Sequence, residues 1–186
     1  MNYRSSAVLA TLLYSGAALA HPGHDHGAMA GLLHPLTGLD HVLAMLAVGL
    51  WGAQLGGRAQ WLLPLGFVAC LALGGALGMA GLALPMVEAG ILASVLLLGA
   101  LIGFAVRLPL LPSLAIVGVF ALFHGFAHGI EMPVAGNGAL YALGFVAASA
   151  ALHCIGLLLG RFALPQGWLR GSGAAISLAG AWLAFA

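Results

Sequence analysis

The chain has 186 residues, of which 63% are hydrophobic and 5% are charged, and its formal net charge is +1. Soluble domains carry about 25% charged residues, so this composition indicates an all-α integral membrane protein of one domain. No basic cluster points to a nucleic-acid partner, and the absence of lysine excludes a Walker A phosphate loop. The two cysteines, Cys70 and Cys154, lie in apolar runs and form no disulfide framework.

Residues 1–20 are predicted to be a cleavable secretory signal peptide. Arg4 provides a positive n-region, residues 7–17 form a short apolar core, and Ala18-Leu19-Ala20 is an A-x-A cleavage site. The alternative is an uncleaved first membrane helix, but the apolar run is short for a span of about 20 residues. Cleavage would place the new N-terminus outside the cytoplasmic membrane.

Residues 21–35 would then form a His-rich periplasmic segment. It begins with three histidines and one aspartate within six residues, namely His21, His24, Asp25 and His26. Imidazoles, a carboxylate and a free amine at this density are typical of a flexible metal-binding tail. The alternative is a solvated polar tail without a ligand.

Residues 36–186 are predicted to form one bundle of six transmembrane helices. Proline and glycine mark the span ends, and each apolar run has about the 20 residues that a bilayer requires. The predicted spans are 36–55, 61–82, 87–106, 110–130, 139–159 and 168–185. Small-xxx-small pairs of the kind that pack membrane helices closely occur at Gly52/Gly56, Gly74/Gly78, Gly99/Gly103, Gly125/Gly129 and Gly156/Gly160.

The arginines give an independent estimate of the orientation. With a periplasmic N-terminus, every arginine after the signal peptide falls on the cytoplasmic side, in agreement with the positive-inside rule. These residues are Arg58, Arg107, Arg161 and Arg170, whereas Glu88 and Glu131 fall on the outer side. We therefore predict an inner-membrane protein with its N-terminus in the periplasm.

A polar cluster lies before and within the first predicted span. His34 and His41 are seven residues apart, so they would share one face of a continuous helix, and Met45 follows His41 by one turn. Asp40 is either a metal ligand itself or the group that orients a ligating imidazole. The alternatives are that Asp40 caps the helix or pairs locally near the outer interface, and that Met45 is a packing residue.

A second polar cluster closes the fourth span. On a helix, His124 and His128 lie about 40° apart and Glu131 about 20° on the other side of His124, so all three face one way. An i,i+4 histidine pair on one face can bind a divalent cation, although two packing histidines bonded to carbonyls are the alternative. Antiparallel spans would bring both clusters into the outer third of the membrane, and such donors suit Ni, Co, Zn or Cu better than Mg or Ca.

One further histidine lies deeper. His153 is about 14 residues into the fifth span, or about 21 Å from its outer end. It is either an inner station for an ion that moves toward the cytoplasm or a hydrogen-bond donor in helix packing.

Together the two clusters resemble the HupE/UreJ family. The motifs are His34-Pro-x-x-Gly38-x-Asp40-His41 and Phe123-His-Gly-x-Ala-His128-Gly-x-Glu131, and the resemblance extends over the whole mature chain. It implies a bacterial permease for Ni²⁺ or Co²⁺ that supplies hydrogenase or urease maturation, with the metal as substrate and no permanently bound cofactor. The functional residues that it implies are His34, Asp40, His41, His124, His128 and Glu131.

Two other classes of function stay open. Ser149-x-x-x-His153, with Asp40 and the His124/His128 pair, resembles in type the residues of membrane zinc hydrolases such as alkaline ceramidases. A metal-binding accessory protein that does not transport would use the same ligands. We predict transport rather than catalysis because His153 is expected far from the outer cluster, and a sensor would need a soluble domain that the chain lacks.

Overall fold

The computed structural model describes residues 27–132 and 137–185, and no strand occurs within them, which confirms the all-α prediction. The predicted signal peptide and the histidines His21, His24 and His26 lie outside the described residues. The elements are α2 (Ala28–Thr37), α3 (Leu39–Leu55), α4 (Ala59–Met79), α5 (Val87–Gly103), α6 (Leu110–Ile130), α7 (Gly138–Leu158), the π-helical turn η2 (Leu159–Ala163) and α8 (Gln166–Leu183).

Several of these helices are long and apolar enough to cross a membrane. Three qualify alone, namely α4, α6 and the continuous α7–η2 unit (Gly138–Ala163), and α2 with α3 qualifies as a fourth, bent span. The helix α5 is apolar but has only 17 residues. The chain is therefore a multi-pass membrane protein, while six complete spans stay a prediction.

The first span differs from the prediction. Helix α2 ends at Thr37, Gly38 is extended (φ −96°, ψ 115°), and α3 starts at Leu39, with a bend of 88° between the two helices. The expectation that His34 and His41 share one face of a continuous helix is therefore wrong. Glycine interrupts a helix readily because it loses more backbone entropy there than any other residue.

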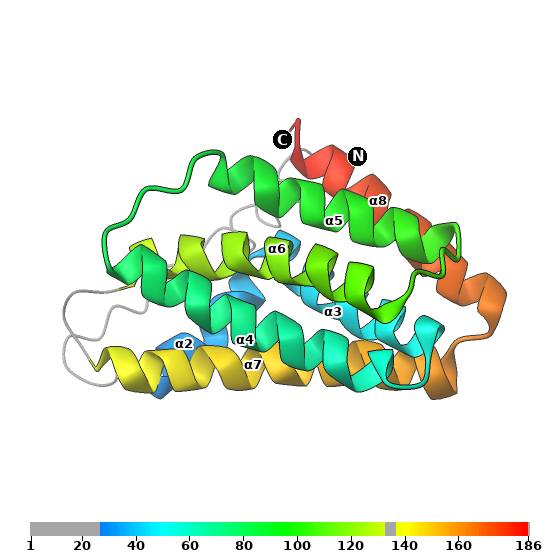
Figure 1. Cartoon of the computed structure of the whole chain (residues 1–186), viewed down its shortest axis with the longest axis horizontal. Coiled ribbons are helices and arrows are strands. Elements are labelled where there is room, and N and C mark those ends of the chain that lie inside the picture. Colours follow the sequence, from blue (N-terminus) through cyan, green and yellow to red (C-terminus); the bar gives the residue numbers. More distant parts are fainter. Residues whose placement is uncertain (1–26, 133–136, 186) are drawn as a thin grey trace, which may run out of the picture.

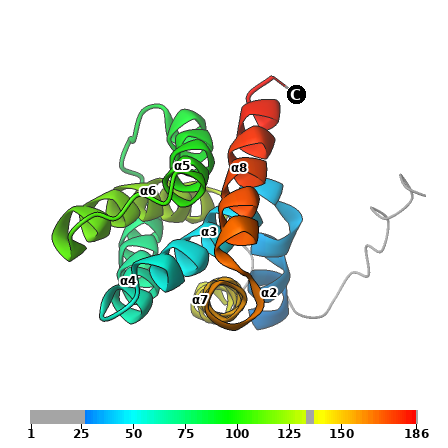
Figure 2. The same cartoon turned by 90° about the vertical axis from the view of Figure 1, so that its right-hand side faces the viewer.

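Helix α3 lies at the centre of the bundle (Figures 1 and 2) and contacts α2, α4, α5, α7 and α8. Outside it, α4 packs on α6, α5 on α8, and α7 on α2. Large side chains such as Trp51, Phe67 and Leu98 are fully buried between these helices. Polar side chains that project from α3 into the bundle are therefore shielded from lipid on all sides.

Glycines determine how α6 is rotated. A Cβ at Gly125 would overlap the carbonyl oxygen of Leu71, and one at Gly129 would overlap that of Gly75, so the glycine face of α6 lies directly on α4. Each of these glycines follows a histidine of the motif, and successive residues lie about 100° apart around a helix. The contact with α4 thus turns the histidines toward the interior. The predicted packing role is wrong for Gly56, which has nothing within 4 Å and ends α3 with φ +71°.

The two ends of the bundle differ in charge. The end on the right of Figure 1, here called the arginine end, holds the links from α3 to α4, from α5 to α6 and from α7 to α8. Two of its arginines connect neighbouring helices, because Arg161 donates to Gln60 Oε1 (2.7 Å) and Arg170 donates to the carbonyl of Gly103 (3.0 Å). The opposite end, the histidine end, holds the start of α3 and the end of α6.

Candidate metal centre

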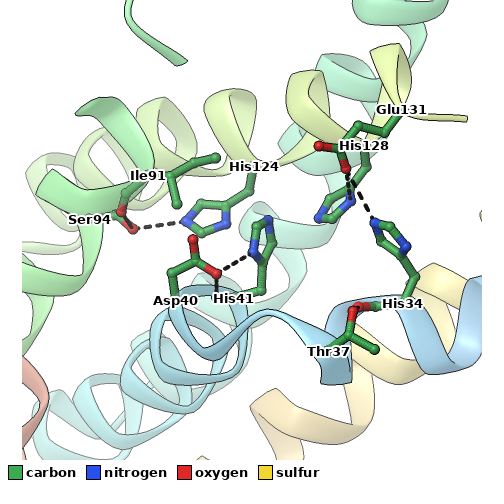
Figure 3. Close-up of polar contacts among 9 residues, drawn as sticks. All are labelled: His34, Thr37, Asp40, His41, Ile91, Ser94, His124, His128 and Glu131. Carbon is green, nitrogen blue, oxygen red and sulfur yellow. Dashed lines mark hydrogen bonds and ion pairs between the residues drawn. The ribbon is translucent and has the colours of Figure 1, made fainter. Parts of the chain in front are cut away.

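Four imidazoles from three helices form a continuous row at the histidine end (Figure 3). The ring of His41, in the first turn of α3, lies with its centroid 4.6 Å from that of His124 and 4.3 Å from that of His128, both on α6. His34 from α2 continues the row, at 4.7 Å from His128. The order along the row is therefore His34, His128, His41, His124. His34 and His41 reach the row from different directions, because the chain bends by 88° at Gly38, between α2 and α3.

The row leads from an open cavity into the core. The cavity has a volume of about 240 Å³, and the titratable residues that line it are His34, Asp40, His41, Glu88, His128 and Glu131. The exposed fraction of the side chain falls from 54% at Glu131 to 33% at His34 and 8% at His128. His124, the last of the row, is completely buried.

The outer part of the row resembles a three-ligand site. One donor atom from each of His34, His128 and Glu131 lies within 4.8 Å of the other two. Glu131 Oε2 is 3.4 Å from His34 Nε2 and 3.8 Å from His128 Nδ1. Two imidazoles and one carboxylate are a donor set for a borderline transition metal rather than for Mg²⁺ or Ca²⁺.

Asp40 orients His41. Its Oδ1 accepts hydrogen bonds from His41 Nδ1 (2.7 Å) and from the backbone N–H of His41 (2.8 Å). An ionised carboxylate can only accept, so Nδ1 of His41 carries the proton and Nε2 carries the free lone pair. This Nε2 has no hydrogen-bond partner in the described part of the chain. Both bonds join Asp40 to the residue next to it, a geometry that fits the predicted orienting role as well as the local-pairing alternative.

Gly38 makes room for this pair. A Cβ built at Gly38 would lie 2.9 Å from both Asp40 Oδ1 and His41 Nδ1. The backbone conformation of Gly38 (φ −96°) is open to any residue, so the available space rather than the dihedral angle accounts for glycine here. The glycine of the first motif is thus part of the site.

Ser94 on α5 is a site residue that the sequence interpretation missed. Its Oγ is 2.8 Å from Nε2 of His124, and both side chains are completely buried. A sequence signal was present, because Ser94 is the single polar residue between Glu88 and Arg107. Nothing in the sequence, however, indicated that Ser94 would contact a histidine of α6.

The weaker candidates lie apart from the row. Met45 is completely buried in the hydrophobic core, one turn beyond His41. His153 is also completely buried, and the ring of Phe67 packs near both it and His124, with centroid distances of 4.8 Å to His153 and 5.8 Å to His124. The hydroxyl of Ser149, one turn before His153, donates to the carbonyl of Phe145 (2.8 Å).

Comparisons with known proteins give a consistent result. A family model described as HupE / UreJ protein matches residues 9–183. The chain is 47% identical over 182 residues to Protein HupE of Rhizobium leguminosarum bv. viciae, and the match covers 96% of this chain and 95% of that protein. No solved structure matches the chain.

Proposed function

The chain belongs to the HupE/UreJ family, and on that premise we propose that it is a secondary permease that carries Ni²⁺ or Co²⁺ into the cytoplasm for hydrogenase or urease maturation. The observation that supports this most directly is the row of four imidazoles that runs from an open cavity to a completely buried histidine. A static binding site needs one set of ligands, whereas transport needs a succession of them. Nickel and cobalt are proposed from the family, because such donors bind copper at least as tightly.

In the proposed orientation, the histidine end faces the periplasm and the arginine end faces the cytoplasm. The six proposed spans are α2 with α3, then α4, α5, α6, α7 with η2, and α8. The signal peptide would be removed after Ala20. The tail with His21, His24 and His26 would then collect cations in the periplasm, and Glu88, which lines the open cavity, would attract them.

The ion would enter past Glu131 and His34 and would exchange its water shell for imidazole nitrogens. His128, His41 and His124 would take it over in turn, with Asp40 holding His41. Such ligands must bind well enough to strip water and weakly enough to release the ion. Beyond His124 the path would pass Phe67 toward His153.

The membrane potential is sufficient to drive this direction of transport. It contributes about 2.3 kcal/mol per elementary charge per 100 mV, and thus about 4.6 kcal/mol for a divalent cation that crosses to a negative interior. No nucleotide or soluble domain is required for this energy.

The hydrolase alternative finds less support. In the described residues no hydrogen bond joins the hydroxyl of Ser149 to a histidine, and this hydroxyl donates to the carbonyl of Phe145. Neither ring nitrogen of His153 has a hydrogen-bond partner within the described residues. A serine nucleophile needs a base within hydrogen-bond reach, so we propose transport without catalysis.

Uptake of ⁶³Ni²⁺ into proteoliposomes with an inside-negative potential tests the proposal. We expect potential-driven uptake by the wild type and its loss in both His124→Ala and Asp40→Ala, since each change removes a ligand or the group that orients one. Cys154→Ser, a change at an exposed position of α7, serves as the matched control and should transport normally. Normal uptake by both site variants, at equal amounts of folded protein, would contradict the proposal.

A further inference from the structure

The single hydroxyl proton of Ser94 goes to a backbone carbonyl rather than to His124. Its Oγ lies 2.6 Å from the carbonyl oxygen of Ile91, three residues earlier on α5, and 2.8 Å from Nε2 of His124 on α6. Two oxygens at 2.6 Å need a proton between them, because lone pairs at that distance repel. The carbonyl of Ile91 has no proton to offer, so Ser94 donates its own to Ile91.

The protonation of His124 follows from this arrangement. With the hydroxyl proton committed to Ile91, Ser94 can only accept from His124, so Nε2 of His124 must be the N–H donor. A neutral imidazole has one protonated and one unprotonated nitrogen. The free lone pair therefore lies on Nδ1, which has no hydrogen-bond partner within the described residues.

The lone pair on Nδ1 faces the row of imidazoles. The two nitrogens lie on opposite sides of the ring, and Figure 3 shows that the nitrogen away from Ser94 is on the side of His41. The two ring planes are nearly perpendicular, at 88°. His41 presents its own unpartnered Nε2, so each of the two rings offers one unprotonated nitrogen to the interior.

We propose that Ser94 is a positioning residue that holds His124 as the Nε2–H tautomer and thereby makes Nδ1 the cation-binding atom of His124. The tautomer is assigned from hydrogen bonds alone. Only the statement about cation binding depends on the proposed permease function. Ser94 on α5 would orient His124 in the same way as Asp40 on α3 orients His41. Each of the two buried imidazoles would then have a fixed cation-binding nitrogen before an ion arrives.

The tautomer can be measured directly by ¹⁵N NMR of the full chain labelled at histidine in lipid nanodiscs. Subtraction of the spectrum of His124→Gln identifies the His124 signals. In the wild type we expect a protonated Nε2 and an unprotonated Nδ1. In Ser94→Ala we expect at least a tenfold shift of the tautomer ratio toward Nδ1–H, and in Ser94→Thr, which keeps the hydroxyl, the wild-type pattern.

Transport provides the second readout. Groups that orient metal ligands typically contribute 10- to 100-fold to affinity, so Ser94→Ala should raise the apparent KM for Ni²⁺ about 10- to 100-fold, and Ser94→Thr should restore it. Ser172→Ala is the matched control, because Ser172 makes the same i→i−3 hydrogen bond to a carbonyl, that of Leu169 (2.7 Å), on α8. This control should leave the KM and the histidine spectrum unchanged.

The possible failures are distinguishable. A wild-type His124 with its proton on Nδ1, or a tautomer ratio unaffected by Ser94→Ala, would overturn the role of Ser94 whatever the protein transports. Active transport with an unchanged KM in Ser94→Ala would overturn the assignment of Nδ1 as the binding atom. An absence of wild-type uptake, with the NMR pattern as expected, would refute the permease and leave the tautomer assignment confirmed.

Discussion

At the scale of single residues, Gly38 has two consequences for the site. It separates α2 from α3, so that His34 approaches the row from a different direction than His41. It also leaves free the space in which Asp40 and His41 form their hydrogen bond. A motif position without a side chain thus contributes as directly to the geometry as the ligands do.

Gly38→Ala is therefore expected to impair transport without unfolding the protein. The added methyl group would lie 2.9 Å from both Asp40 Oδ1 and His41 Nδ1, so the pair must move, and we expect uptake of ⁶³Ni²⁺ to fall about tenfold or more. Gly167→Ala, in the exposed first turn of α8 with nothing within 4 Å, is the control. Equal uptake by the two variants would show that the space at Gly38 is not needed.

Local spacing in the sequence was the main guide to the residues of the site. His124, His128 and Glu131 share one helical face, and Asp40 is next to His41, so local spacing was sufficient for them. Ser94 and Phe67 were missed because their roles depend on which helix lies beside α6. An isolated serine or phenylalanine in an apolar span carries no information about its neighbour.

At the scale of elements, the contact between α4 and α6 determines which way the histidines of α6 point. Gly125 and Gly129 lie directly on the backbone of α4. The sequence indicated this role through the small-xxx-small spacing. It did not indicate helix α2, because the first predicted span began at residue 36 and the histidines before it favoured a polar segment over residues 21–35.

Gly125→Ala should destabilise the bundle, because its methyl group would overlap the carbonyl of Leu71, and overpacking costs about 1–3 kcal/mol. Thermal unfolding in detergent should show a lower Tm. Gly171→Ala, in the exposed middle of α8 with open space around it, should show no loss, since alanine favours a helix over glycine by about 0.5–1 kcal/mol. Unchanged stability of Gly125→Ala would mean that the helices can separate without cost.

Phe67 packs near the rings of both His124 and His153, and it belongs to α4, which contributes no imidazole to the row. Phe67→Ala should lower the free energy of unfolding by about 3–5 kcal/mol, as for other buried phenylalanines. Denaturation of the purified variant measures this change. A loss below about 1 kcal/mol would indicate that the ring is not packed as tightly as its complete burial implies.

At the scale of the whole molecule, the arginines at one end predict that this end faces the cytoplasm. Cysteine labelling can test this orientation and can also test whether α5 crosses the membrane. In a variant with Cys70 and Cys154 changed to alanine, Ala83→Cys, in the link after α4, should react with an impermeant maleimide in intact cells. Arg58→Cys and Arg107→Cys should react only after permeabilisation, because both lie at the arginine end. Reaction of Arg107→Cys in intact cells would show that α5, with its 17 residues, does not cross.

The assembly of the row from α2, α3 and α6 also affects the thermodynamics of folding. An unfolded chain keeps only His124 and His128 close together, so an ion that binds the whole row binds the native state more tightly than the unfolded one. Such a ligand adds RT ln(1 + [L]/Kd) to the free energy of unfolding, about 2.7 kcal/mol at one hundred times the Kd. The transported ion would thus stabilise the folded permease. In cells short of the metal, the permease would therefore be least stable under the conditions in which uptake is most needed.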